Sequence, residues 1–457
     1  MKIPRIRLRI SAVLALLTLL VPILAACGGP PQIANSPTTL PSAVVTIPGA
    51  QQPTAPPAAT EAPTAAPEPP TGAPAQTNQP APTGGPGDLT FPLKTPYLEY
   101  GVIDHLYYTD RERVLTLTTI AGFDWVRQQV VWKDIEGPTP GNYAWGELDN
   151  VVQDTAAHNL KLLISIVQSP SFYNETNGLP QDPKSLGDFV EAMARRYGNK
   201  IGAYEIWNEQ NLARENGGHV TTADAGHYVE ILAECYRRIK AVTPEAYVLA
   251  GPPSSTGFNR EDTAVPDEDY YRAMYSYKNG MIKQFFDAQA VHPGGAANPP
   301  DTLWPDNPSH IEGCDPSPDH CWNDASTHYF RHVEDVRRFM VEEGVGDHQI
   351  WITEYGWATK NNTPGYGFGN FVSLEQQAEY ITGAIKRTYE KYRYEDDTPW
   401  VGVMFLWNMN FAVLWGAQNN PDHEQASFGI LNPDWSPRPS FLAIQGLLAQ
   451  LKKEQGR

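Results

Sequence analysis

The chain has 457 residues, of which 41% are hydrophobic and 11% aromatic, and it carries a formal net charge of −18. A surface this acidic repels nucleic acid and anionic lipid headgroups, so the sequence predicts neither as a partner. The length suits one large barrel or two ordinary domains, provided that two unusual amino-terminal stretches are set aside.

The first of these stretches, residues 1–27, is organised like an export signal. A lysine and three arginines precede an apolar run over residues 11–24, and small residues precede Cys27. The apolar run is too short to cross a membrane as a helix. The Leu-Ala-Ala-Cys ending resembles a bacterial lipobox. That resemblance implies an exported protein held at the cell envelope or cell surface only by lipid on Cys27. The alternative is an ordinary signal peptide with an incidental cysteine.

The second stretch, residues 28–92, is predicted to be a disordered linker. Residues 28–90 contain no Lys, Arg, Cys or aromatic residue, and they hold 16 of the 42 prolines. Such a composition cannot bury enough apolar surface to offset the entropy of ordering. Residues 93–453 contain no further low-complexity break, so we expect them to form one domain.

Within this domain, apolar strand-like runs alternate with helical stretches. Eight such strands predict an α/β fold, a (β/α)8 TIM barrel, rather than an antiparallel sandwich. A doubly wound open sheet is the second interpretation, but it should carry a glycine-rich phosphate turn, and GxGxxG is absent. The predicted strands are Glu99–Ile103, Trp125–Gln128, Lys161–Val167, Ala203–Trp207, Tyr247–Ala250, Ala288–His292, Ile350–Thr353 and Gly402–Trp407. The predicted helices are Leu148–His158, Leu186–Tyr197, Ala223–Ala241, Tyr271–Lys278, His328–Glu342 and Leu374–Tyr392.

Two of the remaining cysteines, Cys314 and Cys321, flank the short loop DPSPDH. In an exported protein this spacing predicts a disulfide. The alternative is that they bind a metal together with His310 and His320, although the spacing matches no zinc pattern. Cys235 falls in a predicted helix and is interpreted as a small buried residue.

Polar side chains follow the predicted strands, at the end where barrel enzymes form their active sites. The fourth strand runs into Asn208 and Glu209, and the seventh strand runs into Glu354. Two carboxylates at the tips of two parallel strands are the minimum that cleavage of a glycosidic bond requires. Taken singly, each carboxylate has the alternative role of capping the next helix. Three further strand tips carry Arg127, His292 and Trp407.

Tryptophans are frequent in the segments after the sixth and eighth strands. An exposed indole is costly unless it is covered, and the apolar face of a sugar ring can cover it. The alternative is that these side chains pack their own loops. They are Trp304, Trp322, Trp415 and Trp435.

Three motifs resemble those of one class of enzyme. The sequence WNEQN follows the fourth strand, ITEYGW lies on the seventh, and GFDWVRQQVVWKDIEGPTPGNYAWGELDNVV covers the second strand and the loop after it. They are similar to motifs of the retaining glycoside hydrolases of clan A, the cellulase-like and β-xylosidase-like (β/α)8 barrels. The similarity runs through most of residues 97–451.

The resemblance implies a division of labour between two carboxylates. Glu209 would be the general acid/base and Glu354 the nucleophile, with their carboxyl groups roughly 5–5.5 Å apart. Asn208 would hydrogen-bond the sugar 2-hydroxyl, and Trp407 would form the floor on which the sugar stacks. No metal or organic cofactor is implied, because the two carboxylates supply both the proton and the nucleophile.

Further residues are assigned to the substrate-binding site. Arg127, close to Glu354, would hold that carboxylate ionised and oriented. Its alternative role is that of an ion-pair partner of Glu205. His292 is assigned to the site with the alternative of a core histidine, and Trp132 belongs to the motif around the second strand.

The sequence departs from the clan after the sixth strand. Many clan members continue with His-Pro-Tyr, whose tyrosine hydrogen-bonds the nucleophile. Here the sequence is His292-Pro293-Gly294, and we expect Tyr329 to reach in from the next segment instead.

The expected function is retaining O-glycoside hydrolysis of an extracytoplasmic poly- or oligosaccharide. A transglycosylase is one alternative, because it differs only in the acceptor that completes the second step. A non-catalytic carbohydrate-binding barrel is the other, although such a barrel should have lost at least one of the two carboxylates.

Overall fold

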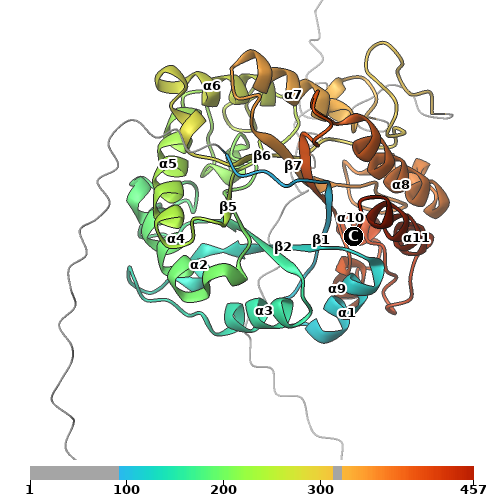
Figure 1. Cartoon of the computed structure of the whole chain (residues 1–457), viewed down its shortest axis with the longest axis horizontal. Helices are drawn as coiled ribbons and strands as arrows, with labels where there is room; N and C mark the ends of the chain where they lie inside the picture. The colour runs from blue at the N-terminus through green and yellow to red at the C-terminus, as the bar shows by residue number, and fades with distance from the viewer. Residues whose placement is uncertain (1–91, 312–321) are drawn as a thin grey trace, which may run out of the picture. The chain divides into compact units, whose positions relative to one another are not determined.

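The structure is a computed structural model that describes residues 92–311 and 322–457. In this part of the chain, eight parallel strands close into a barrel in chain order, with β1 hydrogen-bonded to both β2 and β8 (Figure 1). The predicted (β/α)8 TIM barrel is confirmed. The strands are β1 Glu99–Ile103, β2 Trp125–Val131, β3 Lys161–Val167, β4 Ala203–Ile206, β5 Tyr247–Ala250, β6 Ala288–Val291, β7 Gln349–Tyr355 and β8 Val401–Leu406.

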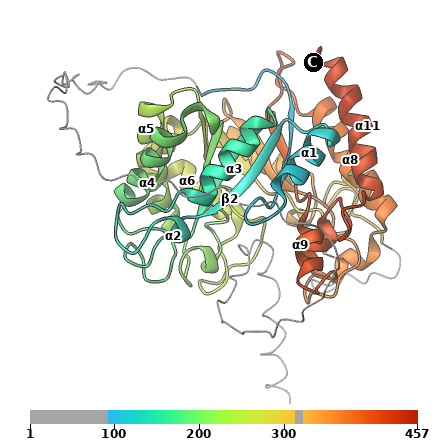
Figure 2. The ribbon, with the colours of Figure 1, turned by 90° about the horizontal axis from the view of Figure 1, so that it is seen from below.

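Helices surround this barrel, as Figures 1 and 2 show from two directions. They are α1 Arg111–Ala121, α2 Trp132–Ile135, α3 Gly146–Ala157, α4 Pro183–Tyr197, α5 Asp224–Val242, α6 Asp267–Gly280, α7 His332–Glu342, α8 Leu374–Lys391, α9 Phe411–Ala417, α10 Glu424–Phe428 and α11 Pro439–Glu454. None of the helices in the described ranges is long and apolar enough to cross a membrane. The predicted export signal with Cys27, the linker up to residue 91, and the pair Cys314 and Cys321 lie outside the described residues.

Two layers of apolar side chains hold the barrel together. One fills the space between strands and helices, where α4 buries Phe189, Val190 and Met193. The other fills the inside of the barrel itself and is built around large rings. Trp125 and Trp351 meet edge to face there, with ring centroids 5.1 Å apart. Small residues on the other strands make room for these rings, since a packed interior tolerates few voids and no overlap.

Gly101 of β1 is one of these small residues, and it gives a test of the interior packing. A Cβ atom added there would lie 2.3 Å from Cδ1 of Phe405. That ring is enclosed by tryptophans, so it has no room to move aside. We expect Gly101→Ala to lower the free energy of unfolding by about 1–3 kcal/mol, measured by urea denaturation.

The control for this prediction is Gly146→Ala, at the first residue of α3. An added Cβ at Gly146 meets nothing within 4 Å, and alanine favours a helix over glycine. This variant should therefore be neutral or slightly stabilising. Equal stability of the two variants would contradict the packing of Gly101 against Phe405.

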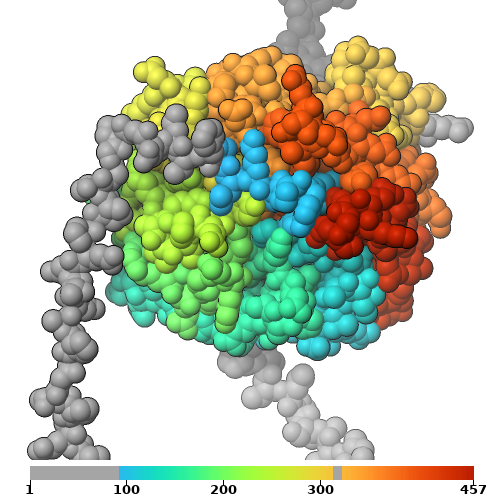
Figure 3. Space-filling view, in the orientation of Figure 1, coloured from blue at the N-terminus to red at the C-terminus, as the bar shows by residue number. Residues whose placement is uncertain are grey.

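Both ends of the described chain lie at the amino-terminal end of the barrel. Thr95 donates its backbone N–H to Oε1 of Gln349, the first residue of β7, at 2.8 Å. The segment around Thr95, blue in Figure 3, covers this end of the molecule. The guanidinium of Arg457 lies over the ring of Tyr97, 4.5 Å from its centroid. The opposite end, where the carboxyl termini of the strands meet, is left for the site.

Candidate active site

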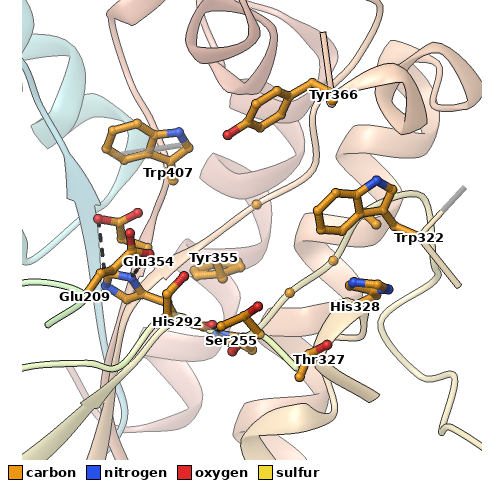
Figure 4. A pocket seen from close by; sticks show the side chains of 18 of the residues that line it. Glu209, Ser255, His292, Trp322, Thr327, His328, Glu354, Tyr355, Tyr366 and Trp407 are labelled. Carbon is orange, nitrogen blue, oxygen red and sulfur yellow. Dashed lines mark hydrogen bonds and ion pairs between the residues drawn. The ribbon is translucent and has the colours of Figure 1, made fainter. Parts of the chain in front are cut away.

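A cavity of about 210 Å³ lies at the carboxyl end of the strands. Residues that follow β4, β5, β6, β7 and β8 line it, and it contains four predicted site residues: Glu209, His292, Glu354 and Trp407. Figure 4 shows the first three together at one end of the cavity, with Trp322 at the other. The fold therefore brings together these four side chains, which were predicted to lie at strand ends.

A strained turn presents Glu209 to the cavity. β4 ends at Ile206, one residue earlier than predicted, because Trp207 takes a left-handed backbone with φ of 69°. Glu209 is also left-handed, with φ of 49°. Residues other than glycine avoid this region, at about 1–3 kcal/mol each, and they keep it mainly where surrounding contacts hold them. The backbone N–H of Glu209 donates to the Pro252 carbonyl at 2.9 Å, and the indole N–H of Trp207 donates to the Glu215 carbonyl at 3.0 Å.

The imidazole of His292 lies between the two carboxylates. Its Nδ1 is 3.2 Å from Oε1 of Glu209, and its Nε2 is 3.7 Å from Oε1 of Glu354. Nε2 is also 3.0 Å from the hydroxyl of Thr353. Since the ring lines the cavity, His292 belongs to the site and is not a histidine of the apolar core.

Arg127 is hydrogen-bonded to three residues in and around the site. Its Nη1 donates to Oε1 of Glu354 at 2.8 Å, its Nε donates to Oε2 of Glu205 at 2.8 Å, and its Nη2 donates to Oδ1 of Asn208 at 2.7 Å. Both predicted roles of Arg127 are therefore present together. The side chain is only 1% exposed. This corrects its assignment to substrate contact, because it acts through the groups that it holds.

Asn208 is also buried, next to Glu209. Its Oδ1 is taken by Arg127, while its Nδ2 has no hydrogen-bond partner among the described residues. A buried polar atom left without a partner in the protein costs free energy and calls for an explanation. The side chain has no exposed surface and is not among the residues that line the cavity, so it stands beside the site without touching it in this structure.

Trp407 follows β8 and is partly exposed to the cavity. Its ring packs against Phe411, with centroids 4.9 Å apart, and the peptide bond to Asn408 is cis. Asn408 donates its side-chain N–H to the Gln425 carbonyl at 2.9 Å. The indole therefore contacts Phe411 and also lines the cavity.

The assignment of Trp132 to substrate binding is wrong. The side chain has no exposed surface. Its ring stacks on those of Tyr173 and Phe189, with centroids 5.1 and 5.4 Å away, and its N–H donates to Oε2 of Glu136 at 2.5 Å. The reason is that α2 begins at Trp132, directly after β2, and turns the indole away from the barrel axis into the packing against the helices.

Tyr329 does not reach Glu354 either. Its hydroxyl donates to the Asn323 carbonyl at 2.8 Å and accepts the N–H of Ser309 at 3.2 Å, so it fastens the loop after β6. The turn that carries Gly294 leaves no space for a tyrosine, because an added Cβ there would lie 2.2 Å from the carbonyl oxygen of Thr327.

Several residues of the site were not predicted. Of the four loop tryptophans, Trp322 lines the cavity, whereas Trp304 stacks on Tyr329 and Trp415 stacks on His423. These residues sit on long loops, where no periodicity indicates which side chains turn inward. The lining residues that the sequence analysis did not name include Arg214, Ser255, His328, Tyr366 and Glu424.

Charge is unevenly distributed around the cavity. Nη2 of Arg214 lies 3.0 Å from Oε2 of Glu209, and its Nε lies 3.2 Å from Oε1 of Glu215. Burial raises the pKa of Glu215 to about 7, although Arg214 opposes this. Burial also lowers the pKa of His328, on the far wall, to about 4. The described residues include no group of three His, Cys, Asp or Glu side chains that could hold a metal ion.

Comparison with solved structures finds several proteins that share the barrel fold. A family 39 glycoside hydrolase from Bacteroides cellulosilyticus matches with a TM-score of 0.53 and 18% identity, over 78% of this chain and 64% of that one. A glucosidase from Croceicoccus marinus matches with a TM-score of 0.53 and 14% identity, over 79% and 69%. An exo-β-1,4-mannosidase from an Opitutaceae bacterium matches with a TM-score of 0.51 and 12% identity, over 80% and 62%.

At these identities the likeness establishes the fold alone. This chain spans less than two thirds of the first and third of these proteins. All three are glycoside hydrolases, the class that the WNEQN and ITEYGW motifs resemble. No protein-family profile matches the chain, and no curated protein matches it.

Proposed function

We propose that the protein is a retaining O-glycosidase acting on a poly- or oligosaccharide outside the cytoplasm. The observation that carries the proposal is the shared cavity of Glu209 and Glu354, bridged by His292 at the carboxyl end of the barrel. Two carboxyl groups flanking one ligand site are the arrangement that glycosidic-bond cleavage needs. The glycosidase folds above support the same reading.

In the first step, a carboxylate oxygen of Glu354 attacks the anomeric carbon, and the bond to the leaving oxygen breaks. Glu209 gives its proton to that oxygen. Arg127 donates a hydrogen bond to Oε1 of Glu354 at 2.8 Å and so orients the nucleophile. In the second step, Glu209 removes a proton from water. The water oxygen then displaces Glu354 from the anomeric carbon and restores both groups.

The neighbouring residues suit the binding of a sugar in this reaction. Asn208, buried beside Glu209 and without a partner for Nδ2 in the described part of the chain, is the donor that we propose for the 2-hydroxyl of a bound sugar. The indole of Trp407 offers an apolar face to the ring. A hydrogen bond to the 2-hydroxyl strengthens in the transition state, so it contributes to rate as well as to binding.

A screen of polysaccharides and aryl glycosides, with products identified by mass, tests the proposal. For a cleaved substrate, proton NMR of the first product should show the same anomeric configuration as the substrate. An inverted first product would contradict the covalent mechanism, and binding without cleavage of any glycoside would favour the non-catalytic barrel. Products longer than the substrate would identify transfer to a sugar acceptor in place of water.

We also propose that the protein is exported and lipid-anchored through Cys27, on the strength of the Leu-Ala-Ala-Cys ending alone. We expect Cys27→Ala to move the protein out of the membrane fraction and to remove the lipid mass from its amino terminus. The control is Cys235→Ala, because Cys235 is buried in α5. Unchanged fractionation of the Cys27 variant, with no lipid on the wild type, would refute the anchor.

A further inference from the structure

The surroundings of Glu209 are unusual for a general acid. Such a group must hold a proton at the start of the reaction. Yet Nη2 of Arg214 lies 3.0 Å from its Oε2, and a guanidinium at this distance favours the ionised carboxylate. Glu209 is 4% exposed, so solvent screens the pair little.

Arg214 is shared with a second carboxylate. Its Nε lies 3.2 Å from Oε1 of Glu215, whose side chain is 10% exposed. A guanidinium has several donors in one plane and can serve two carboxylates at once. Burial raises the pKa of Glu215 to about 7, with Arg214 acting against it and Glu209 and Glu354 reinforcing it. The charge state of Glu215 is therefore coupled to that of the catalytic pair.

We propose that Arg214 and Glu215 are positioning residues that together set the protonation of Glu209, an inference that rests on the proposed glycosidase function. Arg214 donates to Oε2, so the proton of the acid sits on Oε1, the oxygen beside His292. After the leaving group has gone, Arg214 stabilises the carboxylate that must act as a base. Above its own pKa, the carboxylate of Glu215 offsets the charge of Arg214 and so favours the protonated form of Glu209 in the first step.

Other charged groups face Glu209 and stay unchanged in the test. His292 lies 3.2 Å from its Oε1, and Glu354 lies on the far side of that ring. Arg127 forms an ion pair with Glu354, and His328 and Glu424 line the same cavity as Glu209. Because these groups are common to all the variants, differences between variants report on Arg214 and Glu215.

The proposal predicts shifts of opposite sign in the pH dependence of kcat/KM. Above the pKa of Glu209 the acid is lost, so the basic limb of the profile follows that pKa. Arg214→Met removes a cation and should move the basic limb to higher pH. Glu215→Gln leaves the cation uncompensated and should move the limb to lower pH. Each shift should be about one pH unit or more.

The measurement uses a phenyl glycoside of the sugar found in the screen, because its poor leaving group makes the acid necessary. Arg196→Met is the control, since Arg196 forms an exposed ion pair with Asp149 between α4 and α3. Its profile should match the wild type. Shifts in one direction only, or lower activity with an unmoved limb in both variants, would overturn the proposal.

A second readout separates this inference from the proposed function. Protein labelled with ¹³C at glutamate side chains is titrated by NMR, and Glu209 is assigned as the signal lost in Glu209→Gln. The titration midpoint of Glu209 should rise in Arg214→Met and fall in Glu215→Gln, whether or not a glycoside is cleaved. Opposite shifts without activity would defeat only the glycosidase proposal. Cleavage without opposite shifts would defeat only this inference.

Discussion

Glu354→Gln is expected to reduce the turnover of every glycoside by several orders of magnitude. An amide cannot form the glycosyl-enzyme bond, so the loss does not depend on the leaving group. The amide keeps the size of the side chain, and Arg127 keeps Glu205 as a partner at 2.8 Å. The variant should therefore fold and bind substrate with a KM close to that of the wild type. Steady-state kinetics on a good and a poor leaving group measure both effects.

The control for this variant is Glu375→Gln, which changes an exposed carboxylate at the start of α8. It should keep full activity and the same melting temperature. Full activity in Glu354→Gln would remove the glycosidase proposal at this residue. If the melting temperature of Glu354→Gln fell together with its activity, the loss of activity would have a structural cause instead.

Glu209→Ala is expected to discriminate between leaving groups. A poor leaving group needs the proton, and its cleavage should fall by about 10²–10⁴-fold. An activated aryl glycoside departs without help, so its first step should survive and a glycosyl-enzyme should accumulate. Azide attacks this intermediate without a general base, so it should restore turnover and give a glycosyl azide of retained configuration.

Glu354→Ala provides the matched comparison for the azide experiment. Here azide can act only from the face that Glu354 has vacated, without a covalent intermediate, so the product should be the inverted azide. The anomeric configuration of the two azides decides the roles. A retained azide from the Glu354 variant, or an inverted azide from the Glu209 variant, would mean that the two roles are reversed.

The sequence predicted those parts of the site that strand geometry determines. Glu209, His292, Glu354 and Trp407 all stand at the ends of apolar strands, and parallel strands in a barrel bring their carboxyl ends together. Their position at the end of a strand was enough to predict that they belong to the site. Trp132 followed a strand in the same way, but the immediate start of α2 redirected its side chain, and local polarity gave no sign of that turn.

Residues on long loops were beyond such reasoning. Arg214 lies five residues after Glu209, and its contact with that side chain depends on how the turn through Trp207 folds back. The helix α1 was missed for a different reason. Its three threonines are typical of strands, but Thr118 and Thr119 donate their hydroxyls to carbonyls four residues earlier, at 3.0 and 2.9 Å, inside the helix.

The position of the carboxyl terminus has a practical consequence. Thr95 crosses the amino-terminal end of the barrel, and Arg457 rests on Tyr97 at the same end. The cavity opens among the loops at the other end. A purification tag, a fused domain or a bead coupled to Arg457 therefore meets the barrel on the face away from the cavity mouth. A macromolecule as large as a polysaccharide fibre can then approach an immobilised copy without crossing its support.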